Sequence, residues 1–212
     1  MSGNFRESWS YPHGDPSILL FDRAVKAGWM DLPRGARVLE LGCAETDFHA
    51  WLMKADPTIQ LTGVDVNDCP GYSGTFIRGA AEDYLAVPSS RGGFEAVICL
   101  GSLEHFGLGF YGDPKNVYAD TTTAHRAFDW LAPGGWWYYD VPWTPDYGGA
   151  YITDNRHFRV YDDDSVASLD RPGFLPKRRA YAHGNTNTEQ PTRPVSAIVP
   201  FWYLQRLVEK PA

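Results

Sequence analysis

Two residues in the first third of the chain have the side-chain types and the spacing needed to hold a nucleotide. Gly42 directly follows the aliphatic run Arg37–Leu41, and Asp65 lies near the end of a second run, 23 residues after the glycine. In open parallel sheets, ligands bind beyond the carboxyl ends of the strands, where a glycine lets the backbone approach a nucleotide closely. An acid at the end of the next strand accepts hydrogen bonds from both ribose hydroxyls. The pair therefore predicts a ribose-containing ligand at one edge of a sheet.

The residues after Gly42 argue against a dinucleotide. The fingerprint G-x-G-x-x-G requires further glycines, whereas Ala44 and Glu45 follow here. Without these glycines, neither a pyrophosphate cradle nor a phosphate P-loop is expected.

Strand-like and helix-like patterns alternate through the first two thirds of the chain, which is typical of a parallel sheet with helices on both faces. The expected strands are 37–41, 60–66, 74–79, 94–100 and 136–141. The expected helices are 16–30, 48–55, 81–86 and 117–131, the last ending at the stop signal APGG.

The last third has a different pattern. A helix is expected to begin within Asp162–Asp164, and two strand-like stretches follow, Leu175–His183 and Ser196–Leu207, with no helix between them. Two consecutive strands of this kind predict an antiparallel hairpin at one edge of the sheet. We therefore expect an α/β, Rossmann-like sheet of seven strands, mostly parallel, with helices on both faces and a reversed terminal strand. The whole chain, 1–212, is expected to form a single domain with an irregular N-terminal arm over 1–14.

Composition excludes several classes of protein. The formal net charge is -7, with 19 Lys and Arg against 26 Asp and Glu, which disfavours a nucleic-acid or membrane-surface partner. Three cysteines without C-x-x-C spacing suggest neither a disulfide framework nor a zinc site. The polar N-terminus does not resemble a signal peptide, and no apolar run approaches the roughly 20 residues of a membrane span. A soluble cytoplasmic enzyme is the resulting expectation, with its oligomeric state left open.

Further motifs occur in a characteristic order. Ala81-Glu82-Asp83 follows the third strand, GSLEHFG follows the strand FEAVICL, and LAPGGWWYYDVP contains the fifth strand. Together with Gly42 and Asp65, they resemble the class I, Rossmann-like S-adenosylmethionine-dependent methyltransferases over about residues 36–165. The longer stretch GSLEHFGLGFYGDP is most similar to a methyltransferase-like subgroup of unassigned substrate.

The resemblance implies S-adenosylmethionine as cofactor and assigns its contacts to the loops after the first four strands. The matching positions are Glu40, Gly42, Ala44, Asp65, Val66, Ala81, Glu82, Leu100 and Gly101. Two positions depart from the family pattern. Thr46 stands in the glycine loop, where it either crowds the methionine or caps the next helix. Ala80 stands where the family often has an aspartate that binds the adenine amino group, so adenine recognition would rely on the backbone and on Glu82 or Asp83.

The expected reaction is methyl transfer to a small-molecule acceptor, with O-methylation of a sugar-like or other metabolite as the favoured case. A hydroxyl acceptor is helped by a general base, and histidine is the usual choice. By resemblance His157 is preferred, ahead of His105, with the acids Glu104 and Asp140 as alternatives. Aromatic side chains after the fourth and fifth strands, Tyr111 and Trp143 among them, are candidates for the acceptor pocket.

No metal site is predicted, because acids such as Asp162–Asp164 at a helix start more often cap its first turn. Three alternatives remain: a non-catalytic binding module of the same fold, a dinucleotide-dependent oxidoreductase and a nucleic-acid base methyltransferase. The missing phosphate-binding glycines disfavour the second. The third is disfavoured by the charge and by the lack of an N/D-P-P-Y/F signature after the fourth strand.

Overall fold

The computed structural model describes residues 16–87, 93–145, 151–152, 158–183, 186–188 and 202–211. The predicted arm 1–14 lies outside these residues, as do His157 and the start of the last predicted strand, so those predictions stay untested.

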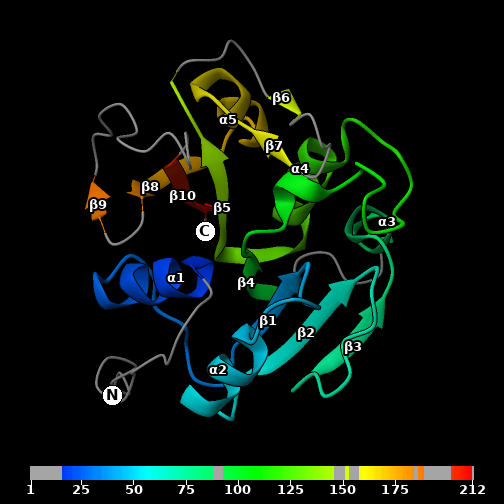
Figure 1. The fold of residues 1–212 in the computed structure, drawn as a ribbon. Helices are drawn as coiled ribbons and strands as arrows, with labels where there is room; N and C mark the ends of the chain where they lie inside the picture. Colours follow the sequence, from blue (N-terminus) through cyan, green and yellow to red (C-terminus); the bar gives the residue numbers. More distant parts are fainter. Residues whose placement is uncertain are drawn as a thin grey trace.

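The described residues contain one large mixed sheet of eight strands in the order β3-β2-β1-β4-β5-β10-β8-β9 (Figure 1). The strands are β1 (Arg37–Leu41), β2 (Gln60–Asp65), β3 (Thr75–Arg78), β4 (Phe94–Cys99), β5 (Leu131–Trp143), β8 (Leu175–His183), β9 (Thr186–Thr188) and β10 (Trp202–Glu209). The first five strands are parallel to one another, whereas β10 is antiparallel to both β5 and β8. The reversed last strand is therefore confirmed. The sequence missed the short β9, whose residues are polar and turn-like. It also missed a separate two-stranded sheet of β6 (Tyr151–Ile152) and β7 (Arg159–Val160).

Helices cover both faces of the sheet, as expected from the alternating pattern. On one face lie α1 (Pro16–Lys26) and α2 (Phe48–Ala55), and on the other lie α3 (Ala81–Ala86), α4 (Ala119–Trp130) and α5 (Asp163–Leu169) (Figure 1). Strand β5 shows why two cores form, because its side chains alternate between faces. Trp136 and Tyr138 pack with α1 and α2, while Trp137 and Tyr139 belong to the opposite cluster.

Element boundaries differ from the sequence expectation at three places. Helix α1 ends at Lys26 rather than near residue 30, because Gly28 adopts φ 73° and its N–H bonds back to Val25 O. Helix α4 begins only at Ala119, so Val117, the first residue of the expected helix 117–131, lies outside it and is 62% exposed. Strand β5 starts at Leu131, immediately after α4, because the APGG segment joins the sheet beside Phe94 through an irregular register.

The start of α5 confirms the predicted cap. The Asp162 carboxylate accepts the Ser165 N–H at 2.8 Å, and the Ser165 hydroxyl accepts the Asp162 N–H at 2.8 Å. This reciprocal arrangement is a capping box, which satisfies two helix-end donors at once.

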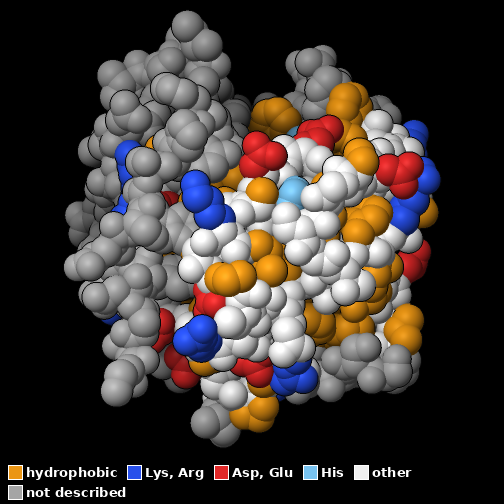
Figure 2. Space-filling model, turned by 90° about the horizontal axis from the view of Figure 1, so that it is seen from below, with side chains coloured by type: hydrophobic (Ala, Val, Ile, Leu, Met, Phe, Trp, Pro, Cys, Tyr) orange, Lys and Arg blue, Asp and Glu red, His pale blue; other side chains and the backbone are white. Residues whose placement is uncertain are grey.

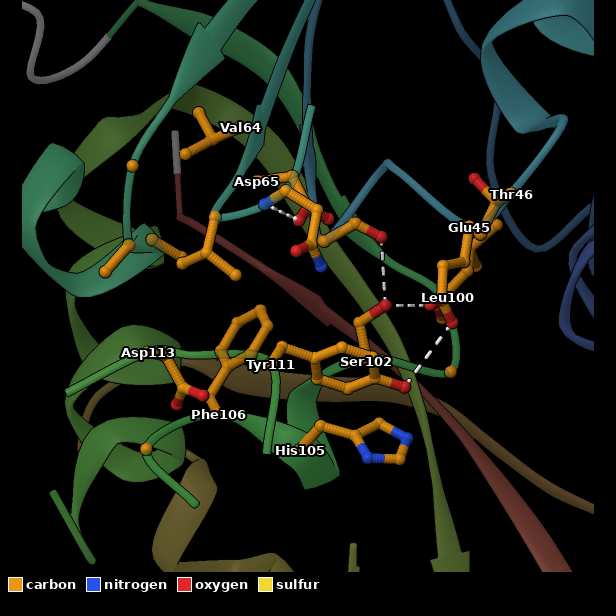
Figure 3. Close-up of a pocket in the computed structure, with 18 of the residues that line it drawn as sticks. Glu45, Thr46, Val64, Asp65, Leu100, Ser102, His105, Phe106, Tyr111 and Asp113 are labelled. Atoms are coloured by element: carbon orange, nitrogen blue, oxygen red, sulfur yellow. Dashed lines mark hydrogen bonds between the residues drawn. The ribbon is translucent and has the colours of Figure 1, made fainter. Parts of the chain in front are cut away.

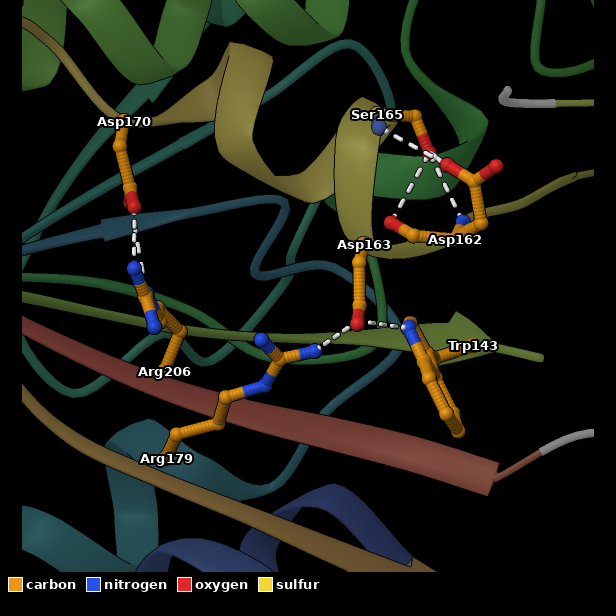
Figure 4. A network of polar contacts seen from close by, with 7 residues as sticks. All are labelled: Trp143, Asp162, Asp163, Ser165, Asp170, Arg179 and Arg206. Carbon is orange, nitrogen blue, oxygen red and sulfur yellow. Dashed lines mark hydrogen bonds and ion pairs between the residues drawn. The ribbon is translucent and has the colours of Figure 1, made fainter. Parts of the chain in front are cut away.

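A network of polar contacts joins α5 to the last strands (Figure 4). Asp163 accepts hydrogen bonds from Trp143 Nε1 at 2.9 Å and from Arg179, while Arg206 pairs with Asp170. The Arg179 guanidinium also lies over the Tyr181 ring, 4.9 Å from its centroid. These contacts fasten β8 and β10 to the helix layer.

Within the described residues, no helix has the length and apolar character needed to cross a bilayer. On the face shown in Figure 2, Lys and Arg side chains are interspersed with Asp and Glu over the described surface rather than gathered in one patch.

Candidate functional site

A cavity of about 240 Å³ lies at the carboxyl ends of β1, β2, β3 and β4 (Figure 3). This is the edge at which the sequence predicted a nucleotide. Nine of the predicted site residues line it: Gly42, Asp65, Val66, Ala81, Glu82, Leu100, Gly101, His105 and Tyr111. Residues far apart in the sequence, such as Asp65 and Leu100, which are 35 positions apart, are brought together by the parallel pairing of the strands.

The Asp65 carboxylate is fixed in orientation by two backbone groups. One oxygen accepts the Ala44 N–H at 2.9 Å, and the other accepts the Asn67 N–H at 2.8 Å. A carboxylate oxygen has two lone pairs, so each oxygen keeps acceptor capacity for a ligand. Ala44 therefore acts through its backbone, behind the carboxylate, and its side chain does not line the cavity.

Gly42 is required by the packing of the cavity wall as well as by its backbone conformation. Its φ is 74°, which L-residues with a side chain rarely adopt. A Cβ atom here would lie 2.4 Å from Ser102 Cβ and 2.6 Å from Ser102 Oγ. Ser102 Oγ lies 2.9 Å from both Gly42 O and Leu100 O, and its single hydroxyl proton is donated to one of these two carbonyls at a time. The loops after β1 and β4 thus touch at this glycine.

Glu40 lies behind the cavity rather than on its surface. Its side chain is buried, and its two oxygens accept hydrogen bonds from Thr46 Oγ1 at 2.9 Å and from the Tyr72 hydroxyl at 2.8 Å. Thr46 does not cap α2, because the N-cap residue of that helix is Asp47 and no side chain caps it. The Thr46 hydroxyl instead donates its hydrogen bond to Glu40. Glu40 therefore fixes the conformation of the loop after β1, and other residues of that loop, such as Gly42 and Glu45, line the cavity.

The loop after β4 is fixed at its base. Gly107 O accepts the Asn116 N–H at 2.9 Å, and a Cβ on Gly107 would lie 2.0 Å from Asn116 O. Arg159, in β7 (Arg159–Val160), donates to the Phe106 carbonyl at 2.7 Å and to the Val117 carbonyl at 3.3 Å. Its Nε also lies 3.4 Å from Asp120, and both side chains are almost fully buried. One guanidinium thus holds both ends of the loop.

The tip of this loop reaches across the cavity. The Tyr111 hydroxyl donates to Glu45 at 3.4 Å, which connects the loops after β4 and β1 (Figure 3). His105 lines the same wall, with its ring edge-on to Tyr111 at 5.5 Å and to Phe158 at 6.1 Å between centroids. His105 is thus the described histidine that a bound acceptor could meet.

Glu104, the neighbour of His105, is buried and is not among the residues that line the cavity. Its side chain is 3% exposed, and burial, with the nearby Asp140 as a second cause, raises its pKa well above the usual range. One oxygen of Asp140 accepts the Gly101 N–H at 2.9 Å. The two acids therefore lie beneath the cavity floor, where a neutral Glu104 is favoured.

The remaining predicted residues are not brought to the cavity in the described part of the chain. Trp143 is 4% exposed and packs in the core with Tyr181, so it is not among the lining residues. His157 lies outside the described residues. The roles proposed for both from the sequence stay predictions.

Asp113 is a cavity residue that the sequence reasoning missed. It lies at the end of the cavity formed by α3, away from Glu45 (Figure 3). Both of its carboxylate oxygens are buried and have no hydrogen-bond partner among the described residues. Nearby Glu82 has a raised pKa, chiefly because of burial, with Asp83 and Asp113 adding to the effect. The one sequence signal that could have identified Asp113 is its position in the glycine-rich loop after β4.

Comparison with solved structures confirms the fold. The 1,6-didemethyltoxoflavin-N1-methyltransferase of Burkholderia thailandensis, solved with 1,6-didemethyltoxoflavin and S-adenosylhomocysteine bound, is 17% identical and superimposes with a TM-score of 0.60 over 96% of this chain and 94% of that chain. A putative methyltransferase from Bacillus halodurans is 14% identical, with a TM-score of 0.58 over 94% of this chain and 100% of that one.

The fold is not restricted to proteins described as methyltransferases. The [4+2]-cyclase SpnF is 15% identical, with a TM-score of 0.63 over 92% of this chain and 80% of that one. No protein-family model matches the sequence, and no curated protein matches it. At these identities the likeness establishes the fold, which is that of the class I S-adenosylmethionine-dependent methyltransferases, as the sequence motifs predicted.

Proposed function

We propose that this protein transfers a methyl group from S-adenosylmethionine to a small-molecule acceptor, with a hydroxyl oxygen of a sugar-like or other metabolite as the favoured target. The observation that carries the proposal is the Asp65 carboxylate, held by two backbone N–H groups at the edge of the cavity. A carboxylate fixed in this way is suited to a ribose diol, because both of its oxygens keep lone pairs for hydroxyl donors.

The other lining residues fit the rest of this cofactor. Gly42, Gly101, Thr46, Ala81, Glu82 and Asp113 also line the cavity, with Thr46 and Asp113 on opposite sides of it (Figure 3). When bound, the cofactor supplies a sulfonium-activated methyl group.

The chain's own task is to position the acceptor and to exclude water. The Tyr111–Glu45 hydrogen bond closes one side of the cavity, and the rings of Phe106 and Tyr111 form aromatic walls of the kind that favour a positive charge. For a hydroxyl acceptor, His105 is the described side chain on the cavity wall that is able to take the proton.

Calorimetric titration with S-adenosylhomocysteine tests the proposal directly. The wild-type protein is expected to bind it, and Asp65→Ala is expected to weaken binding at least about a hundredfold, because two hydrogen bonds to a charged group are lost. Asp68→Ala is the matched control: Asp68 is exposed, pairs with Arg78 at 3.1 Å and does not line the cavity. Thermal unfolding of both variants shows whether the fold is retained.

The outcomes separate the alternatives. Binding of NADH but not of S-adenosylhomocysteine would replace the proposal with a dinucleotide-dependent oxidoreductase. Binding of S-adenosylhomocysteine without transfer of labelled methyl groups to any of a panel of sugars and phenols would favour a binding module. Binding of neither ligand would refute the cofactor assignment.

A further inference from the structure

The connection between β2 and β3 is short for two parallel strands. Residues 66–74, all of which the structure describes, separate the two strands and contain no helix. Such a crossover usually takes about a dozen residues or more and contains a helix that covers the sheet. Here the ring of Tyr72 lies against β2 instead, because a Cβ atom on Gly63 would lie 2.3 Å from Tyr72 Cζ. Tyr72 thus packs where a helix would otherwise lie, and the glycine leaves room for its ring.

The segment that carries Tyr72 is fixed to α2. The His49 ring of that helix lies 4.7 Å from the Tyr72 ring between centroids, and His49 Nδ1 accepts the N–H of Ser73 at 3.2 Å. Burial lowers the pKa of His49, so the neutral ring keeps the lone pair that this hydrogen bond requires. The position of the Tyr72 ring is therefore set by the helix layer and by β2.

The Tyr72 hydroxyl contacts a buried carboxylate next to the cavity. It donates a hydrogen bond to Glu40 Oε2 at 2.8 Å. Burial, with the Glu40 charge as a second cause, raises the pKa of Tyr72 well above its usual range, so the tyrosine remains the donor. Glu40 is 1% exposed, and a buried carboxylate depends on its protein donors because water does not replace them. Removal of the hydroxyl would therefore disturb Glu40.

Glu40 connects Tyr72 to the wall of the cavity. Its other carboxylate oxygen accepts the Thr46 hydroxyl at 2.9 Å, and Thr46 lines the cavity (Figure 3). The Ala44 N–H of the same loop donates to Asp65 at 2.9 Å. A loop that is held at both places is ordered before a ligand arrives, so it loses little conformational freedom on binding.

Resting on the proposed function, we infer that Tyr72 is a positioning residue for the cofactor: its hydroxyl, acting through Glu40, holds the loop 42–46 in the conformation that binds S-adenosylmethionine. Tyr72 is not among the described residues that line the cavity, so its effect on binding is indirect. Without the hydroxyl, the loop adopts further conformations, and each binding event has to order it again.

The test compares matched variants by calorimetric titration with S-adenosylhomocysteine. Tyr72→Phe removes the hydroxyl and keeps the ring. Tyr138→Phe is the control, because it removes the hydroxyl of another buried tyrosine, which donates to Gln205 Oε1 at 3.3 Å and does not line the cavity. Glu40→Met, alone and combined with Tyr72→Phe, removes the carboxylate through which the hydroxyl acts. Thermal unfolding shows whether each variant is folded at the titration temperature.

We expect Tyr72→Phe to weaken S-adenosylhomocysteine by about threefold to tenfold, the range that corresponds to one ordinary hydrogen bond. Tyr138→Phe should change the Kd by less than about twofold, although it also loses a buried hydrogen bond. In the Glu40→Met background, Tyr72→Phe should weaken binding by less than about twofold further, because two changes in one network are not additive.

Three results overturn the inference while leaving the proposed function intact. The first is a Tyr72→Phe variant that binds S-adenosylhomocysteine as tightly as the wild type. The second is an equal weakening by Tyr138→Phe, which would reveal a general effect of lost stability. The third is an undiminished effect of Tyr72→Phe in the Glu40→Met background, since the hydroxyl would then not act through Glu40. If Glu40→Met does not fold, the first two results decide alone. A wild type that does not bind S-adenosylhomocysteine overturns the proposed function and this inference together.

Discussion

Replacing Gly42 with alanine tests the reasoning about how the cavity wall is built. The backbone φ of 74° costs an alanine about 1–2 kcal/mol relative to glycine. The new Cβ would also lie 2.4 Å from Ser102 Cβ, and relief of such overpacking typically costs about 1–3 kcal/mol. We therefore expect Gly42→Ala to lower the free energy of unfolding by about 2–5 kcal/mol. For a chain of 212 residues this corresponds to a drop in Tm of about 4–20 °C.

A double-mutant cycle with Ser102→Gly separates the two causes. Removing the serine side chain leaves Phe106, at 3.4 Å, as the nearest atom to the new Cβ, which is ordinary contact. In the Ser102→Gly background, the alanine should therefore cost only the conformational part, about 1–2 kcal/mol. Urea unfolding of the four proteins gives the required differences. Equal costs in both backgrounds would refute the steric argument, and an unchanged Tm for Gly42→Ala alone would refute both parts.

Two further predictions concern buried charges near the cavity. Arg159→Met should lower the free energy of unfolding by about 3–5 kcal/mol in urea, because it leaves the buried Asp120 carboxylate without its cation; a loss below about 1 kcal/mol would contradict this. Burial and the nearby Asp140 raise the pKa of Glu104 in the folded protein. Above about pH 4.3, the ordinary pKa of a glutamic acid, Glu104 is therefore deprotonated in the unfolded chain while it still holds its proton in the folded protein. The wild type should therefore lose stability as pH rises from that value through the folded pKa, and Glu104→Gln should lose less over the same range. Urea unfolding at several pH values from 5 to 8 checks this, and parallel curves for the two proteins would show that Glu104 does not titrate in this way.

The parts of the site that could be predicted from the sequence are those placed by local patterns. Gly42, Asp65 and Gly101 each lie near the end of a short buried run, and parallel pairing brings strand ends to one edge whatever the details of packing. The cap at Asp162 is similarly local, because donor and acceptor are three residues apart. Such features need only the strand or helix period and a few residues beyond it.

The rest depends on contacts between distant segments, which no local pattern encodes. Glu104 and His105 are neighbours in one turn of 3-10 helix, η2 (Leu103–His105), yet one is buried under the floor and the other lines the cavity. Three residues give no periodicity from which to tell their faces apart. Asp113 is placed by a loop whose ends are set by Arg159, more than forty residues later, so its position could not be inferred from its neighbours.

The bracing of the loop by Arg159 has a consequence for how such a protein can diversify. Arg159 donates hydrogen bonds to the backbone carbonyls of Phe106 and Val117 at the two ends of this segment, and every amino acid provides such a carbonyl. Substitutions between those two ends would leave these hydrogen bonds and the scaffold beneath them unchanged, with the exception of Gly107, where a Cβ would lie 2.0 Å from Asn116 O. Substitutions in this segment can therefore change the ligand preference with little loss of folding stability. The segment is the natural place to engineer a new specificity.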